Sequence, residues 1–314
     1  MCPYGESADV GASVFSFLGS EVRLRILDSL YERTVEPGPM ADAASYSTIR
    51  ADVGVEDSGR FSYHLDKLTD RFVTRHEDGY RLREPGREVV RLRRTGVLSD
   101  DLTVEFEPID ATCYRCDSTV EVGYDQGHLL TRCPDCPGLL DHELAPEGTL
   151  TALSYPPSGI ESTDRETAFR RAHRRVEHRV LMMGSGFCPR CGGDVTTLFE
   201  PCDAETEPAS GSDGLLHPGF TELACEHCGT LRVTHPLQIV SDREPVASLL
   251  AARDADPGWE RFAELMRWPV TVDDGRIEFE APDGSILSVS GNLEIDHLTS
   301  TPADLQRPEA RGPD

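Results

Sequence analysis

Between Asp57 and Phe72, apolar and polar residues follow the period of an α-helix. The apolar residues recur at i, i+4, i+7 and i+11, which predicts one buried stripe: Phe61, Leu65, Leu68 and Phe72. The opposite face carries Arg60, Tyr63 and Lys67. Asp57 or Ser58 supplies an N-cap oxygen just before the stripe. The pattern therefore predicts a helix that stands on a core and exposes a basic face.

Further elements are predicted on both sides of this helix. Upstream, a helix is expected over 21–32, with Val22, Ile26, Leu27 and Leu30 on one side, and a shorter helix over 48–53, capped by Ser47. Downstream, strand-like runs at 72–76 and 80–83 flank an Asp-Gly hairpin signal, and a helix is expected over 84–94. This order is that of a winged helix-turn-helix, in which the third helix enters the major groove.

Two stretches carry a family resemblance. Residues 17–27 (FLGSEVRLRIL) resemble the opening helix of ArsR-type winged-helix regulators, and residues 62–68 (SYHLDKL) resemble their recognition-helix signature. The winged-helix resemblance covers about residues 14–96, and most of the remaining chain is similar to a group of regulators from halophilic archaea in which this domain precedes zinc ribbons. The resemblance implies double-stranded DNA as the partner and a homodimer. Metalloid-sensing members carry cysteines in the helix before the recognition helix, and residues 47–53 contain none, so the resemblance does not extend to arsenic sensing.

The charge of the chain bears on this interpretation. The full sequence has 56 acidic and 31 basic residues, which is unusual for a DNA-binding protein. Residues 14–95, however, contain thirteen Arg and one Lys against fourteen Asp and Glu, so the acidic excess lies elsewhere. Lys67 is the only lysine. The resemblance to halophilic proteins accounts for such a composition, because molar salt screens self-repulsion to about 3 Å; an acidic mesophilic protein is the alternative.

Eight of the ten cysteines form Cys-x-x-Cys pairs, which indicates metal binding rather than a secreted disulfide framework. Sixteen residues that read as a hairpin separate the first two pairs: Cys113, Cys116, Cys133 and Cys136. Thirty-three residues, including a polar loop at 203–213, separate the other two: Cys188, Cys191, Cys225 and Cys228. Four thiolates fill a tetrahedral site, so we expect two structural Zn²⁺ ions. The alternative, reduced cysteines packed in a core, does not explain the repeated spacing, and Cys2 and Cys202 are expected to be free.

The rest of the chain predicts one long helix and a C-terminal module. The helix spans 162–183, begins with a Thr163–Glu166 capping box and has a basic face: Arg170, Arg171, Arg174 and Arg175, with His173 and His178 nearby. This face reads as a solvated surface, with a second nucleic-acid site as the alternative. Helices at 246–253 and 258–268 then precede a β-meander, whose expected core residues are Trp259, Phe262 and Trp268.

The sequence thus predicts an α+β protein: an N-terminal winged helix-turn-helix, two small four-cysteine zinc-ribbon β modules with an intervening long helix, and a C-terminal helix-plus-β-meander module. The predicted divisions are a flexible N-terminus at 1–13, the DNA-binding domain at 14–96, zinc ribbons at 103–150 and 184–236 joined by the basic helix at 162–183, the C-terminal module at 237–300 and a disordered tail at 301–314.

The predicted function is transcriptional regulation through DNA binding. The side chains expected to contact DNA come from the recognition helix and the wing: Arg60, Ser62, Tyr63, His64, Lys67, Arg75, Arg81 and Arg83. The alternative is a protein-interaction module that docks onto a transcription or RNA-processing assembly. An enzyme is not expected, because the sequence has no Gly-rich phosphate loop, nucleophile elbow or open metal site. With no charged leader and no apolar run of membrane-spanning length, a cytoplasmic protein without membrane contact is expected.

Overall fold

The computed structural model describes residues 17–33, 43–99, 102–140, 145–199, 220–273, 276–290 and 293–299. The chain divides into two compact units, Met1–Ser99 and Asp100–Asp314. The predicted lead-in, tail and acidic loop, together with Cys2 and Cys202, lie outside the described residues. The architecture is mixed α and β, with helices dominating the first unit and strands the second.

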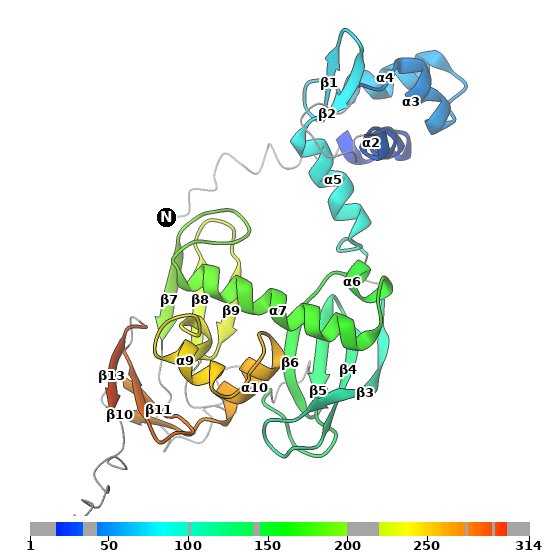
Figure 1. The fold of residues 1–314 in the computed structure, drawn as a ribbon. Helices are drawn as coiled ribbons and strands as arrows, with labels where there is room; N and C mark the ends of the chain where they lie inside the picture. Colours follow the sequence, from blue (N-terminus) through cyan, green and yellow to red (C-terminus); the bar gives the residue numbers. More distant parts are fainter. Residues whose placement is uncertain are drawn as a thin grey trace, which may run out of the picture. The chain divides into compact units, whose positions relative to one another are not determined.

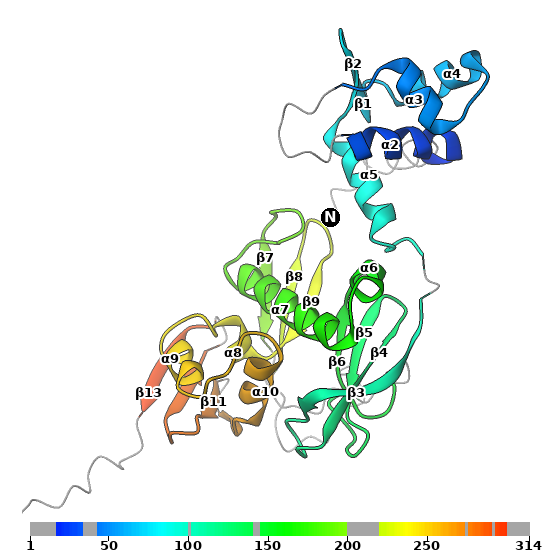
Figure 2. The same ribbon diagram turned by 45° about the vertical axis from the view of Figure 1, so that its right-hand side comes forward.

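Among its described residues, the first unit contains the helices α2 to α5 and a hairpin, which Figure 1 shows in blue to cyan. Their order is α2 (Glu21–Arg33), α3 (Tyr46–Val53), α4 (Ser58–Leu68), β1 (Val73–His76), β2 (Gly79–Leu82) and α5 (Glu84–Arg94). The predicted apolar stripes form one core, in which Ile26, Leu27, Ile49, Phe61 and Leu68 are fully buried. Figure 2 shows α3 and α4 on one side of α2 and the hairpin beside them.

Two predicted details of this unit are wrong. The N-cap of α3 is Ser45 and not Ser47: the Ser45 side chain accepts from the Thr48 backbone N–H, so the helix begins at Tyr46. Helix α4 ends at Leu68 and does not continue to Phe72, because Thr69 is extended and Asp70 adopts a left-handed φ of 67°. Phe72 is still buried, but it reaches the core from the turn that leads into β1.

The predicted hairpin is present, and its antiparallel register runs from Val73 opposite Leu82 to His76 opposite Gly79. Backbone hydrogen bonds in both directions also join Ala44 to Tyr80. Gly79 has φ 144°, and any side chain there would collide with the Ala44 carbonyl. The glycine is therefore required by the close approach of two backbones as well as by the turn.

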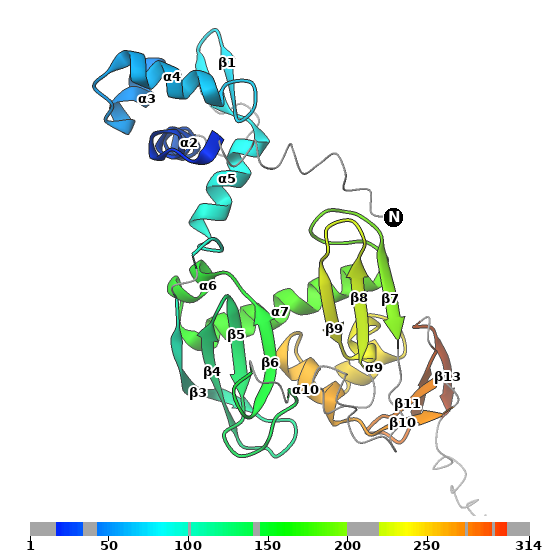
Figure 3. The ribbon, with the colours of Figure 1, turned by 180° about the vertical axis from the view of Figure 1, so that it is seen from behind.

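The second unit contains three antiparallel sheets. The first has the order β3 (Val104–Thr112), β4 (Thr119–Asp125), β5 (His128–Arg132), β6 (Thr149–Ser154), and the second has the order β7 (Val195–Phe199), β8 (Thr221–Cys225), β9 (Leu231–Thr234). The third is the predicted meander with one additional strand: β10 (Val270–Asp273), β11 (Arg276–Glu280), β12 (Ile286–Val289) and β13 (Ile295–Thr299). Figure 3 shows the first two sheets against different parts of one long helix.

That helix, α7 (Arg165–Gly184), contacts strands of both sheets. Its N-cap is Asp164, which accepts from the Thr167 N–H at 2.8 Å, so the predicted capping box at Thr163 is wrong. The other helices are α6 (Pro157–Glu161), α8 (Pro236–Ile239), α9 (Val246–Ala251) and α10 (Trp259–Arg267).

Two hydrophobic cores divide the second unit differently from the prediction. Trp259 and Phe262 of α10 pack with the first sheet and the start of α7, whereas Trp268 packs with the meander and the end of α7. The expectation that all three aromatic residues form the core of one C-terminal module is therefore wrong. Different sides of α10 contact the two cores. The periodicity of the sequence shows which residues of a helix are apolar, but it does not show which core each of them joins.

Candidate metal centres and candidate DNA-contacting surface

The first candidate metal centre lies at one end of the first sheet. Cys113 and Cys116 occupy the turn between β3 and β4, and Cys133 and Cys136 follow β5. Because β4 pairs with both β3 and β5, the two turns meet. The Sγ atoms of Cys113 and Cys136 are 3.8 Å apart, and those of Cys116 and Cys133 are 3.4 Å apart.

The second candidate centre repeats this arrangement in the second sheet. Cys188 and Cys191 precede β7, Cys225 ends β8 and Cys228 precedes β9. The Sγ atoms are 3.6 Å apart for Cys188 and Cys228 and also for Cys191 and Cys225. Within each centre all four sulfur atoms lie within 4.8 Å of one another.

These distances fit a tetrathiolate metal site. Four sulfur atoms at about 2.3 Å from a central zinc would be about 3.8 Å apart in tetrahedral geometry. Backbone N–H groups point at the sulfur atoms, since Arg115 donates to Cys113 and Arg190 donates to Cys188, each at 3.4 Å. Each group of four cysteines could therefore hold one metal ion, and the groups are compatible with zinc binding.

Hydrogen bonds favour the thiolate at one cysteine of each centre, Cys116 and Cys228, whereas burial raises the pKa of Cys113 and Cys133. The residue after the second cysteine of three knuckles adopts a left-handed φ: Asp117 at 59°, Gly192 at 73° and Gly229 at 69°. Hydrogen bonds from Ser118 lower the pKa of Cys116 to about 7, and those from Thr230 lower the pKa of Cys228 to about 6. Thiolates are the metal-binding form of cysteine, so Cys116 and Cys228 are the positions most readily available to a cation, whereas the neighbouring cysteines raise the pKa of Cys191.

The residues predicted to contact DNA separate into two groups on α4. Arg60, Tyr63 and Lys67 are exposed, and the Lys67 ammonium lies 5.7 Å from the centre of the Tyr63 ring. Ser62 instead hydrogen-bonds the Tyr46 hydroxyl at 2.8 Å, and Nδ1 of His64 accepts from Nε of Arg23 at 3.4 Å. Burial, Arg23 and Arg60 lower the pKa of His64. Ser62 and His64 thus join α4 to the rest of the unit.

The three arginines predicted to contact DNA from the wing also differ in exposure and ion pairing. Arg75 and Arg83 are exposed, and the Arg75 guanidinium lies 5.9 Å from the centre of the Tyr80 ring. Arg81 is half-buried and pairs with Asp78 at 2.8 Å. Of the three, Arg81 is therefore the least available for a phosphate.

Ion pairing distinguishes this surface from α5. The arginines of α5 are paired with carboxylates, as in Arg93–Asp28 at 2.6 Å and Arg94–Glu32 at 3.0 Å, and so is Arg33 of α2 with Asp52 at 2.7 Å. Among the described residues, no carboxylate pairs with the cations at four predicted contact positions: Arg60, Lys67, Arg75 and Arg83. Four cations of α4 and the segment after it are therefore free of ion pairs with described carboxylates.

Sequence reasoning missed Tyr46. Its ring packs edge-on against Phe61 with centroids 4.9 Å apart, and its hydroxyl donates to the Ser58 carbonyl at 3.0 Å. Tyr46 therefore fixes α3 to α4. Tyr46, Ile49 and Val53 are spaced i, i+3 and i+7, and this stripe was the available signal.

The basic face of α7 is exposed at Arg170, Arg171, Arg174 and Arg175, and Arg170 pairs with Glu166. His173, which the sequence suggested to be near this face, is instead buried against the Phe169 and Trp259 rings. A helical position one residue from the predicted face points into the core.

Two family models match the chain. One, described as Domain of unknown function (DUF7347), matches residues 11–92, and the other, described as Domain of unknown function (DUF7351), matches residues 110–303. No curated protein matches the chain. In the described part of the chain, no helix combines the length and apolar character needed to cross a membrane.

Proposed function

We propose that this chain, which belongs to the DUF7351 family, is a transcriptional regulator that binds double-stranded DNA through its N-terminal unit. In this proposal, α3 and α4 are the helix-turn-helix, α4 is the recognition helix, and β1–β2 is the wing of an ArsR-type winged helix. The regulator acts as a homodimer. Two Zn²⁺ ions, one in each four-cysteine group, have a structural role because four thiolates complete a tetrahedral shell.

The observation that carries the proposal is the unpaired positive charge on α4 and the hairpin. Arg60 and Lys67 lie on the face of α4 opposite its buried residues. Arg75 belongs to the hairpin that follows, and Arg83 is the N-cap of α5 directly after it. Side chains on a recognition helix read base edges in the major groove, and basic side chains on a wing contact phosphates. Ser62 and His64 position the helix and do not contact bases.

The proposed zinc ions supply no reaction step. Zinc would be held by Cys113, Cys116, Cys133 and Cys136 in one centre and by Cys188, Cys191, Cys225 and Cys228 in the other. Bound there, it would cross-link turns that are far apart in sequence. The binding free energy of such a site is largely folding free energy.

A binding experiment tests the DNA-reading proposal. Sequences are first selected from a random duplex library with the purified chain, and affinities for the selected and a scrambled duplex are then measured at several salt concentrations. Arg60→Ala should weaken binding to the selected duplex by about tenfold or more, because a bidentate arginine–guanine contact discriminates by about 1–3 kcal/mol. Lys67→Ala should weaken both duplexes alike, as expected for a phosphate contact.

Arg91→Ala is the matched control, because Arg91 is an exposed arginine of the same unit that pairs with Glu84 and Glu88. Its affinity for both duplexes should equal that of the unmodified chain. Failure to enrich any sequence, or an equal loss in the Arg60 and Arg91 variants, would contradict the proposal.

A second candidate function is docking onto a larger protein assembly. The observation that favours it is the group of exposed apolar side chains on the second sheet: Leu198, Leu231 and Val233, which are 47–55% exposed. Exposed apolar clusters mark interaction surfaces. Recovery of the chain in a stable complex, without sequence-selective DNA binding, would favour this candidate.

A further inference from the structure

The second unit contains a cavity of about 300 Å³ between its first two sheets. Strand β6 lines one side and β9 the other, and α7 and α10 contribute His173 and Phe262. Small-molecule sites usually span about 300–1,000 Å³ and combine apolar walls with a few polar groups. This cavity lies at the lower end of that range.

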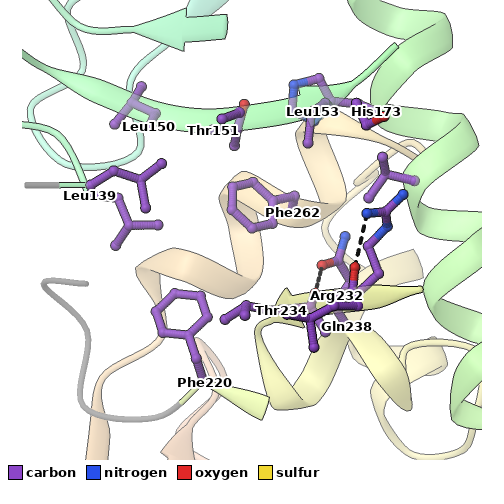
Figure 4. A pocket seen from close by; sticks show the side chains of 16 residues that line it. Leu139, Leu150, Thr151, Leu153, His173, Phe220, Arg232, Thr234, Gln238 and Phe262 are labelled. Atoms are coloured by element: carbon purple, nitrogen blue, oxygen red, sulfur yellow. Dashed lines mark hydrogen bonds between the residues drawn. The ribbon is translucent and has the colours of Figure 1, made fainter. Parts of the chain in front are cut away.

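The lining of the cavity is polarised. Figure 4 shows Leu139, Leu150 and Phe220 at one end and Arg232, Thr234 and Gln238 at the other. Thr234 donates to Oε1 of Gln238, which leaves the Gln238 amide nitrogen as a donor beside Arg232. One end thus suits a hydrocarbon body, and the other offers hydrogen-bond donors.

Two buried polar atoms of the lining have no partner among the described residues. They are Nε2 of His173 and Oγ1 of Thr151, in side chains that are 5% and 8% exposed. An unsatisfied buried polar group costs about 1–3 kcal/mol, so such groups are usually paired in a completed site. Both atoms belong to side chains in the wall of the cavity.

The charged side chain at the polar end of the described lining is a cation, Arg232; the nearby sulfur of Cys188 acts to raise its pKa, but no described carboxylate pairs with it. Arg232 lies near Arg175 and Arg179 of α7, and burial together with Arg175 lowers the pKa of both Arg179 and Arg232. None of the three arginines forms an ion pair with a described residue. The described lining of the cavity contains no acidic side chain, although acidic residues outnumber basic ones by 56 to 31 in the chain.

We propose that this cavity binds a small carboxylate with an apolar body, whose carboxylate is held by Arg232 and the Gln238 amide. The hydrocarbon body lies against Phe262 and the leucine-lined end. A guanidinium is suited to a carboxylate because it presents planar paired donors and keeps its charge. This site is separate from the DNA-binding proposal and does not depend on it.

Isothermal titration calorimetry of the full-length, metal-loaded chain tests the site with three probes. The probes are 4-phenylbutyrate, its neutral isostere 4-phenylbutanamide, and acetate, which has the head group without the body. 4-Phenylbutyrate should bind at least tenfold more tightly than the amide and at least a hundredfold more tightly than acetate. Arg232→Met should weaken 4-phenylbutyrate at least tenfold and leave the amide unchanged.

Arg179→Met is the matched control, because Arg179 belongs to the same arginine group but does not line the cavity. It should change the affinity for 4-phenylbutyrate by less than threefold, and unchanged metal content and unfolding temperature establish that both variants are folded. Equal losses in the two variants, equal binding of acid and amide, or no binding at 10 mM ligand would overturn the proposal.

Discussion

The two four-cysteine centres have the same ligand geometry but different surroundings. In each, one cysteine of every pair is buried and the other is more exposed, and the sulfur distances agree within a few tenths of an ångström. Cys113 and Cys133, however, belong to a hydrophobic core together with Trp259 and Phe262. Cys188 and Cys225 belong to neither core of the second unit, and Phe187 beside them is 43% exposed. The spacing of the cysteines thus determines the geometry of each centre. The apolar contacts around the cysteines determine how much of the folding free energy depends on that centre.

The largest effect is expected from Cys133→Ser. The change removes one thiolate from the centre that is part of a core, so metal binding and packing should be lost together. We expect one metal ion fewer per chain and a loss of at least about 4 kcal/mol in the free energy of unfolding, the size typical of losing a metal. Elemental analysis and denaturant unfolding followed by Trp259 fluorescence measure both.

Trp268→Phe serves as the background for this experiment, because it leaves Trp259 as the only tryptophan in the chain. If the Cys133 variant loses its metal but keeps native Trp259 emission and stability, then the first centre is not coupled to its core, and the two centres do not differ in this respect.

The matched change in the second centre is Cys225→Ser, which alters a cysteine that is equally buried. One metal ion should again be lost, but the free energy of unfolding measured through Trp259 should fall by only about 2 kcal/mol or less, because Cys225 makes no core contact with that residue. Hydrogen exchange should report opening confined to β7, β8 and β9. Equal global destabilisation by the two serine variants would remove the difference between the centres.

Features that depend on local spacing could be predicted from the sequence, whereas features that depend on tertiary contacts could not. Cys-x-x-Cys spacing identified all eight cysteines of the two candidate metal centres, since two residues between cysteines suffice to build each knuckle. Helical periodicity located α2, α4, α5 and α7, because each has one continuous apolar stripe. The sequence could not assign Trp259 and Trp268 to different cores, since that division depends on which sheet each side of α10 meets.

The cavity and the ion pairing were beyond sequence reasoning for the same reason. Arg60 and Arg91 are both exposed arginines of predicted helices, and only the positions of Glu84 and Glu88 distinguish the unpaired one from the paired one. Likewise, His173 lies in a run of arginines that reads as a polar face. Its burial follows from the Trp259 ring, which is supplied by a helix more than eighty residues later.

The buried His173 should make the stability of the first core of the second unit depend on pH. Burial lowers the pKa of His173 to about 3, against an ordinary value near 6.5. The folded chain therefore keeps His173 neutral while the unfolded chain takes up a proton below about pH 6.5, so stability falls as the pH decreases, by about 1.4 kcal/mol per pH unit. The window tested is pH 6.5 to 5.0.

His173→Phe isolates this contribution, because it removes the titrating group and leaves the thiolates of both centres to titrate as before. The difference in free energy of unfolding between the two chains should change by about 2 kcal/mol across the window. Parallel pH profiles for the two chains would mean that His173 has the same pKa in the folded and unfolded states.

The smallest effect is expected from Val233→Thr in the second sheet. Val233 is 48% exposed, whereas Val122 in the first sheet is 1% exposed and part of the core. Val→Thr keeps the shape of the side chain and adds a hydroxyl. The resulting change in the free energy of unfolding therefore reports whether that hydroxyl is buried when the chain folds. Val233→Thr should change the free energy of unfolding by no more than about 0.5 kcal/mol, and Val122→Thr should lower it by about 2 kcal/mol. Denaturant titrations of both variants measure the two changes in the free energy of unfolding. A similar decrease at the two positions would mean that Val233 is covered in solution, as it would be by a second copy of the chain.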